Sequence, residues 1–460
     1  MNPIRTGVTF QSDDLLLQKL FDAAERKLRA NEKDFGGNRV LIEGGGYHKI
    51  WLETQPMGGQ MYAKRDMQIA LNNQLLFIAH QRPDGRLPGS IMMENGRVVP
   101  QFNKFQGFCF PAPALNMYYW LQKDREYLLT LYGALEKFDG YLWRNRDSDG
   151  DGCLESWCVY DTGEDNARRY GDAPRWWEEE APPRGYQVVP MASMDFMSYS
   201  FSARDALAKI SSILENGREA FWQGAAAEVA RKIRTYLWSE ERGACFDRDK
   251  NGRRMETLTH NNLRCMYWGS FSRDMAHRFV TEHLLNPAEF WTPFPLPSVA
   301  ANDPLFVNIP ENDWSGQPQG LTYQRAIRAL ENYGYVSLVK ELGRKLFSAV
   351  GGDCVFTQQF DPFTGRRSGD LDGYGPTMLA VLEYIERLYG VHLEGEELWW
   401  GAAGGRETVY TQNWGEKTYT LHTGMRTATA FINGKAAFTV KTGSRAVTDY
   451  DGNLLRVLPM

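Results

Sequence analysis

Helical periodicity runs from residue 12 to about residue 390, and it constrains the fold more than any other feature of the chain. Leu17, Leu20 and Leu28 recur at helical spacing behind a Ser-Asp-Asp N-cap, and Gly390 follows the last such run as a stop signal. Further helices are predicted over 62–82, 113–123, 125–145, 191–214, 217–238, 271–284, 318–333, 335–349 and 378–389. About ten to twelve helices in one stretch predict a mainly α fold.

Long segments rich in glycine, proline and aromatic residues separate these helices. They cover residues 35–60, 83–112, 146–190, 286–317 and 351–375. Connections of this length are uncommon in a compact domain and are typically functional or disordered. The chain has 24 Phe, 22 Tyr and 14 Trp, many of them in these segments, which argues against disorder. We therefore expect ordered loops that cover one end of a helical scaffold and build a site there.

The pattern changes to period two after about residue 405. Residues 408–459 alternate between apolar and polar side chains, and Asn433-Gly434 between two such runs is a strong hairpin signal. This predicts a small C-terminal antiparallel β segment of about four to six strands. An (α/α)6 toroid and an open helical array both fit the helical part, and the lack of a fixed-period repeat favours the toroid. We expect a helical domain over 1–400 and a β appendix over 401–460 that packs on it.

Charge and cysteine usage exclude several classes of protein. The formal net charge is −5 without a run of like charges, which argues against nucleic acid and anionic membranes as main partners. No stretch approaches 18 apolar residues, and the first residues lack the apolar core of a signal peptide, so we expect a cytoplasmic location. The six cysteines are scattered and are expected to be buried thiols. The oligomeric state is left open.

The acidic segment 146–180 has two interpretations, and the first is a calcium loop. Asp147, Asp149 and Asp151 alternate like the first half of an EF-hand, but Cys158 stands where the bidentate acid is needed. A similar half-match is formed by Asp247, Asp249 and Asn251. Acidic Asx turns explain both patterns without a metal.

The second interpretation is a carbohydrate site. Glu164 and Asp165 follow a glycine turn, and Trp157, Trp176 and Trp177 lie near them in the sequence. Sugars combine apolar faces with polar edges, which suits aromatic rings beside carboxylates. Glycoside hydrolysis also needs two carboxyl groups. A solvated acidic loop with core tryptophans is the alternative explanation.

Two more segments favour carbohydrate binding. The first places polar groups beside a tryptophan at a loop-to-helix junction, and the second places carboxylates beside a tryptophan before a long helix. Arg65 and Asp66 could equally form a structural ion pair. The candidate binding residues in these segments are Trp51, Glu53, Tyr62, Arg65, Asp66, Glu311, Asp313, Trp314 and Gln317.

The order of three motifs resembles the (α/α)6-barrel glycosidases of glycoside hydrolase family 63 and their mannosylglycerate-hydrolase-like relatives, with trehalases more distant. The family's loop G-D-G…E-S-G-x-D-N-S corresponds to residues 150–166, and its W-x-G-x-x-W to residues 314–319 without the second tryptophan. Its E-N-Y-x-P-x-T-G corresponds to residues 358–365, which read QQFDPFTG. The likeness spans roughly residues 40–390, and no single motif is matched in full.

The resemblance implies roles for particular residues. Asp165 matches the general acid, whereas the base position holds Gln358, an amide that cannot take a proton from water. A displaced base could be Asp361, Asp313 or Glu53, and we favour Glu311 because its loop faces the barrel mouth in the family.

The implied activity is an inverting, exo-acting cleavage of a short oligosaccharide or small glycoside, with the two carboxyl groups roughly 6.5–9.5 Å apart. It requires no cofactor. Trp51, Trp176, Trp177 and Trp314 are candidates for sugar stacking or for the core.

Three other functions remain open at this stage. The amide at Gln358 favours a non-catalytic or catalytically altered carbohydrate-binding protein. The helical scaffold with a β segment is also compatible with an α-L-rhamnosidase-like glycosidase. A sugar epimerase of the same shape would use histidines such as His48 or His260, which lie outside the carboxylate motifs.

Overall fold

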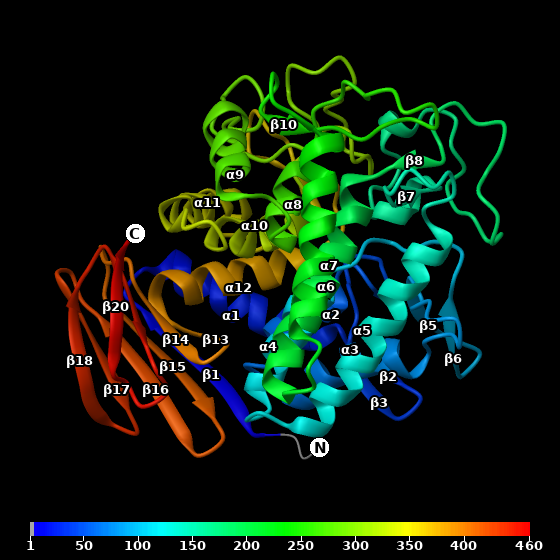
Figure 1. Ribbon diagram of the computed structural model, residues 1–460. Coiled ribbons are helices and arrows are strands. Elements are labelled where there is room, and N and C mark those ends of the chain that lie inside the picture. The colour runs from blue at the N-terminus through cyan, green and yellow to red at the C-terminus, as the bar shows by residue number, and fades with distance from the viewer. Residues whose placement is uncertain (1–3) are drawn as a thin grey trace.

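The computed structural model describes residues 4–460 and is mainly helical up to residue 389 (Figure 1). Within these residues no helix is both long and apolar enough to cross a membrane. The α-helices are α1 (Leu15–Ala30), α2 (Gln55–Tyr62), α3 (Met67–Ala79), α4 (Pro111–Trp120), α5 (Arg125–Asn145), α6 (Met194–Leu214), α7 (Glu219–Lys232), α8 (Asn261–Trp268), α9 (Arg273–Phe279), α10 (Gly320–Glu331), α11 (Val336–Val350) and α12 (Gly375–Tyr389).

The helices pack mainly on their neighbours in the sequence. α6 contacts α5, α7 and α8, and α10 contacts α8, α11 and α12. α12 also packs on α1 and α2, so the last helix lies against the first two. The mainly α prediction is confirmed for this part of the chain.

Most predicted helices are present, with three differences. The range 62–82 contains α3, which begins only at Met67 because the Asp66 carboxylate accepts a hydrogen bond from the Ile69 N–H. α2 lies almost entirely in a range that was predicted to be a loop. α8 was not predicted. All eight of its residues are buried, so it has no polar face to produce a helical period.

The long connections are ordered and carry short strands. Those that contain β7, β8 and β10 gather on the side of the helices away from the C-terminal sheets (Figure 1). The strands are β2 (Glu32–Phe35), β3 (Asn38–Leu41), β4 (Ile50–Trp51), β5 (Ser90–Glu94), β6 (Arg97–Gln101), β7 (Glu155–Ser156), β8 (Met191–Ala192), β9 (Trp238–Ser239), β10 (Ala244–Cys245), β11 (Gln359–Phe360) and β12 (Arg367–Ser368).

The C-terminal β segment is larger than predicted and forms two antiparallel sheets. The five-stranded sheet has the order β1-β15-β16-β17-β18 and the four-stranded sheet the order β13-β14-β19-β20. Their strands are β1 (Thr6–Ser12), β13 (Val391–Glu394), β14 (Glu397–Ala402), β15 (Thr408–Trp414), β16 (Lys417–Thr423), β17 (Thr427–Ile432), β18 (Lys435–Lys441), β19 (Ser444–Thr448) and β20 (Leu454–Pro459).

The expected turn at Asn433-Gly434 is present, with both residues in the left-handed region between β17 and β18. β1 joins this sheet from the other end of the chain, as the blue strand beside the orange ones in Figure 1 shows. The predicted division at residue 400 falls within β14.

Buried charges connect the sheets to the helices. The Lys64 ammonium pairs with the carboxylates of Glu383 and Glu386 on α12, and all three side chains are almost completely buried. His392 on β13 also contacts Glu386. Because unpaired charges are costly in the interior, this cluster holds α2, α12 and β13 in one arrangement.

Candidate active site

Asp165 lies in a tight turn between two short 3₁₀ helices, Val159–Thr162 and Arg168–Tyr170. Gly163 opens this turn with a φ of 72°. A Cβ at Gly163 would come within 2.4 Å of the Glu53 carboxyl group. The position therefore requires glycine for both its conformation and its space. The same turn brings the loop that carries Glu53 next to Asp165.

Asp165 is half-buried and receives hydrogen bonds from two amide side chains. Gln106 Nε2 donates to Oδ1 over 3.3 Å, and Asn312 Nδ2 donates to Oδ2 over 3.0 Å. The Trp314 N–H donates to the Asp165 carbonyl over 3.0 Å and fixes the backbone. Burial raises the pKa of Asp165, and the bonds from Gln106 and Asn312 offset that rise only in part. Such a carboxyl group can keep its proton at a higher pH than a solvated aspartate.

Gln358 lies on the other side of Asn312. Its Nε2 donates to Asn312 Oδ1 over 3.0 Å, and its Oε1 accepts from the Tyr47 hydroxyl over 2.9 Å. Asn312 Nδ2 also lies 3.2 Å from the Tyr47 oxygen. One amide side chain thus connects Asp165 to Gln358, so the structure brings together the two residues that match the acid and base positions of the resemblance.

Two further carboxyl groups, Glu43 and Glu53, lie close enough for the charge of Asp165 to act on them. Burial raises the pKa of Glu53 to about 7, against the lowering effect of Arg325 and Arg264. Burial also raises the pKa of Glu43 well above its usual range, and the nearby Glu53 adds to that rise. The negative charge of Asp165 adds to the rise in the pKa values of both groups.

Glu53 was predicted, whereas Glu43 was missed. The Tyr374 hydroxyl donates to Glu43 Oε1 over 3.0 Å, and the Arg325 guanidinium pairs with Glu53. Glu43 precedes three consecutive glycines, and this turn was the one local signal that could have drawn attention to it.

A layer of buried ion pairs lies behind these carboxyl groups. Glu164 pairs with Arg169 at 2.6 Å, and Asp195 pairs with Arg264 at 2.9 Å. Burial would raise the pKa of Glu164, but Arg169 and Arg264 outweigh it and hold that pKa far below its usual range. Glu164 therefore stays ionised and supports the turn of Asp165 rather than supplying a proton.

Trp51 is flanked by two lysines. The Lys49 ammonium lies 5.2 Å and the Lys104 ammonium 5.6 Å from the Trp51 ring, and Lys104 is also 5.9 Å from the Tyr160 ring. Their hydrogen bonds go to neutral acceptors, the side chains of Gln101 and Asn103. Within residues 4–460 neither lysine has a carboxylate partner.

The three other predicted bases are placed differently. Glu311, the preferred one, is exposed. Asp313 is buried, pairs with Arg168 at 3.3 Å and accepts from the Ser315 N–H. Asp361 accepts hydrogen bonds from Asn308 and from two backbone N–H groups of its own turn. Burial would raise the pKa of Asp361, but these bonds outweigh it and lower that pKa.

Several predicted binding residues have other partners. The Tyr62 hydroxyl donates to Glu32. Arg65 pairs with Glu25 rather than with Asp66, so the alternative of an Arg65–Asp66 ion pair is not realised. Gln317 donates to Asn308 over 2.7 Å at the foot of the loop that carries Asn312. Among residues 4–460, no hydrogen bond or ion pair joins Tyr62, Arg65 or Asp66 to Asp165, Asn312 or Gln358.

The four predicted sugar platforms differ in exposure. Trp51 is half-buried beside the lysines, and Trp176 is 52% exposed with its ring 6.5 Å from Tyr160. Trp177 is half-buried, and its Nε1 donates to the Ala181 carbonyl. Trp314 is 2% exposed and packs between His260 and Arg264, so it belongs to the core beneath the site.

The two acidic half-motifs differ in their partners. Asp147, Asp149 and Asp151 can each offer a carboxylate oxygen within 4.8 Å of the others, so their spacing is compatible with a cation. In the second motif Asp247 pairs with Arg169, and Asp249 accepts from backbone N–H groups of its own turn. In this second motif the Arg169 guanidinium already supplies the positive charge that a metal cation would bring to Asp247.

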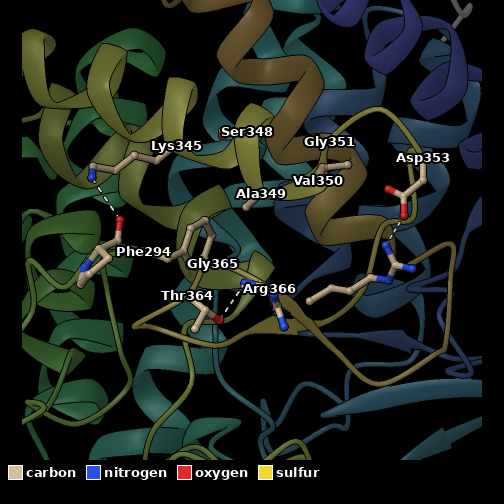
Figure 2. A pocket seen from close by; sticks show the side chains of 12 residues that line it. Phe294, Lys345, Ser348, Ala349, Val350, Gly351, Asp353, Thr364, Gly365 and Arg366 are labelled. Carbon is tan, nitrogen blue, oxygen red and sulfur yellow. Dashed lines mark hydrogen bonds and ion pairs between the residues drawn. The ribbon is translucent and has the colours of Figure 1, made fainter.

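A cavity of about 810 Å³ lies away from these residues (Figure 2). It is formed by the end of α11, the turn before β12 and the segment around Phe294. Lys345 donates to the Pro293 carbonyl, and Asp353 pairs with Arg367. It contains none of the predicted site residues.

Comparison with known proteins agrees with this geometry. A family model described as the mannosylglycerate hydrolase MGH1-like glycoside hydrolase domain matches residues 51–375, well over half of the chain. None of the curated proteins matches it by sequence.

Several solved structures share the fold. A GH63 mannosylglycerate hydrolase from Thermus thermophilus, in complex with glucose, has 18% identity and a TM-score of 0.63 over 79% of this chain and 99% of that one. The neutral trehalase of Saccharomyces cerevisiae has 14% identity and a TM-score of 0.59 over 79% of each chain. A sialidase has 14% identity and a TM-score of 0.73 over 97% of this chain and 42% of that one. The family match covers the loops of Glu53, Asp165, Asn312 and Gln358, and the chain therefore belongs to the mannosylglycerate hydrolase MGH1-like glycoside hydrolases and is a glycosidase.

Proposed function

We propose that this glycosidase cleaves a short oligosaccharide or small glycoside from its end, with inversion at the anomeric carbon. Asp165 donates the proton to the leaving oxygen. One observation carries this proposal: the Asp165 carboxyl group is half-buried, has a raised pKa and receives hydrogen bonds only from neutral amides. A group in that setting keeps a proton to give, as general acid catalysis requires.

Attack by water requires a base in addition. Gln358 cannot serve, because its amide is neutral and both ends are engaged by Tyr47 and Asn312. Of the four predicted candidates, Glu53 is the one whose ionisation is coupled to Asp165. With a pKa of about 7 it is partly ionised at neutral pH. Hydrolysis at this site therefore depends on Glu53.

We also infer the architecture behind the site. The consecutive packing of the helices and the likeness to toroidal glycosidases support an (α/α)6 toroid. In this arrangement the helical part up to residue 389 forms the catalytic domain, and β1 together with residues 391–459 forms the β appendix. The mechanism uses acid–base chemistry alone and needs no cofactor.

The test is turnover of a panel of aryl glycosides and disaccharides, including α-L-rhamnosides, by wild type and Asp165→Asn. We expect Asp165→Asn to reduce kcat by about 100-fold or more, since general acid catalysis contributes 10²–10⁴-fold. Glu311→Gln is the matched control, because Glu311 is exposed. Unchanged turnover in Asp165→Asn would overturn the assignment, and the configuration of the first product, read by proton NMR, tests inversion.

A further inference from the structure

We propose a further activity: inorganic phosphate binds beside Lys49 and Lys104 and attacks the anomeric carbon in place of water. This inference rests on the proposed function, since it uses the same proton of Asp165. It explains two features together, the amide at the base position and a pair of lysines that form no salt bridge within residues 4–460.

The first feature is the amide of Gln358 at the position that matches the base. A water molecule must lose a proton as it attacks, and Gln358 cannot accept it. Monohydrogen phosphate is already an anion at neutral pH and needs no base to become a nucleophile. An active site with one proton donor and an anionic co-substrate is therefore chemically complete without a carboxylate at Gln358.

The second feature is the lysine pair. The Lys104 side chain is largely withdrawn from water, at 8% relative exposure, and burial together with the nearby Lys49 charge lowers its pKa. Within residues 4–460 both ammonium groups have only amide oxygens as hydrogen-bond acceptors. Two adjacent, partly desolvated cations without a carboxylate are unfavourable alone and favourable once they share an oxyanion.

The lysines belong to the loops that form the site. Lys104 lies two residues before Gln106, which donates to Asp165, and Lys49 lies two residues after Tyr47, which donates to Gln358. The Lys49 and Lys104 ammonium groups lie 5.2 Å and 5.6 Å from the centre of the Trp51 ring. Trp51 Nε1 is a buried donor without an acceptor in residues 4–460 and could complete the oxyanion site.

The reaction balances without another reagent. A phosphate oxygen forms a bond to the anomeric carbon as the glycosidic C–O bond breaks, and the proton of Asp165 goes to the leaving oxygen. The products are an alcohol and a glycosyl phosphate of inverted configuration. The proton carried by the attacking monohydrogen phosphate then returns to the Asp165 carboxylate.

Binding is tested first, independently of turnover. Inorganic phosphate is titrated into the full-length protein by calorimetry in HEPES buffer, for wild type, Lys104→Met and Lys49→Met. We expect saturation by about 20 mM phosphate in wild type and at least about tenfold weaker binding in each variant. Lys435→Met is the control, because Lys435 is exposed on β18. Asp165→Asn should still bind phosphate, which separates this test from the assignment of the acid.

Turnover is tested next on the same glycoside panel with phosphate, with sulfate at equal ionic strength, and with neither. We expect phosphate to accelerate cleavage at least about tenfold and to yield glycosyl phosphate by phosphorus NMR, whereas sulfate inhibits. Three outcomes overturn the proposal: no phosphate binding, no glycosyl phosphate from any substrate, or equal cleavage in phosphate-free buffer. Equal cleavage with a preference for acidic leaving groups would assign the lysines to the substrate instead.

Discussion

Asn312 donates a hydrogen bond from Nδ2 to Oδ2 of Asp165 over 3.0 Å. Its Oδ1 accepts from Gln358, so the orientation of its amide is determined at both ends. The hydrogen bond from Asn312 to Asp165 favours the ionised form of Asp165 and opposes the effect of burial on its pKa. Asn312 therefore both positions the proposed proton donor and limits how far its pKa rises.

Asn312→Asp should move the pH dependence of cleavage. It replaces a donor with a second carboxyl group about 3 Å from Asp165, and the repulsion of two like charges so close raises the pKa at which the pair loses its second, shared proton. We expect the alkaline limb of kcat/KM to shift upward by about one pH unit or more. Asn308→Asp is the matched control, as Asn308 contacts Asp361 and Gln317 instead. An identical profile in both variants would contradict the role of Asn312.

Gln358→Glu should increase hydrolysis in phosphate-free buffer. The new carboxylate would stand at the position that the family uses for its base, next to the Tyr47 hydroxyl. General base catalysis contributes about 10²–10⁴-fold, so we expect at least about tenfold faster release of free sugar. Gln358→Leu, which removes the polar group without adding a base, should show no gain. If Gln358→Glu also gains nothing, the amide does not occupy the base position.

The fold could be predicted where local signals and packing agree. The range of α5 was predicted because the Asp124 N-cap precedes a regular series of apolar residues, and the structure has the same range. β1 could not be predicted, because its partner β15 lies some 400 residues away and its own sequence is polar on both sides of Phe10. The strands predicted over 408–459 are present as β15 to β20, and the β segment was underestimated because β13 and β14 precede the range in which alternation was recognised.

In the candidate site, too, contacts between distant segments could not be predicted. Asp165 was predicted because its turn is a contiguous motif. Glu43 was missed because nothing beside it in the sequence is acidic, and its partner Tyr374 is distant along the chain. Glu311 was preferred as a base for its place beside Trp314, but sequence order does not reveal that its side chain is exposed. Which carboxyl groups lie close together depends on contacts between different loops, and the composition of a single loop does not reveal these contacts.

Glu53→Gln should change how stability depends on pH. In the unfolded chain a glutamate has a pKa of about 4.3, whereas burial raises the pKa of Glu53 to about 7. The folded state therefore holds an extra proton between these values, and its free energy of unfolding falls as the pH rises through this window. The raised pKa corresponds to about 4 kcal/mol.

Urea unfolding of wild type and Glu53→Gln from about pH 4 to pH 8 measures this effect. We expect the loss of stability across the window to be smaller in Glu53→Gln by a few kcal/mol, whatever the absolute stability of the variant. Glu311 is exposed, so the stability of Glu311→Gln should depend on pH as that of wild type does. If the free energy of unfolding changed with pH by the same amount in wild type and Glu53→Gln, the raised pKa of Glu53 would be contradicted.

Removal of calcium should leave the protein unchanged. Each of the three clustered aspartates already accepts a backbone N–H: Asp147 from Gly152, Asp149 from Asp151, and Asp151 from Cys153. These bonds stabilise the turn without an ion. We expect EDTA and millimolar calcium to give the same Tm. A calcium-dependent rise in Tm that disappears in Asp149→Asn would instead establish the site, because a ligand of the folded state stabilises by mass action.

Lys64→Met should destabilise the junction between the helices and the C-terminal sheets. It leaves the buried carboxylates of Glu383 and Glu386 without their cation, although Arg387 still contacts both. Breaking a buried ion pair from one side costs about 3–5 kcal/mol, so the midpoint of urea unfolding should fall accordingly. Lys417→Met removes an exposed pair with Asp451 and should cost about 0–1 kcal/mol. Equal losses in the two variants would mean that the buried cluster adds no more stability than a surface pair.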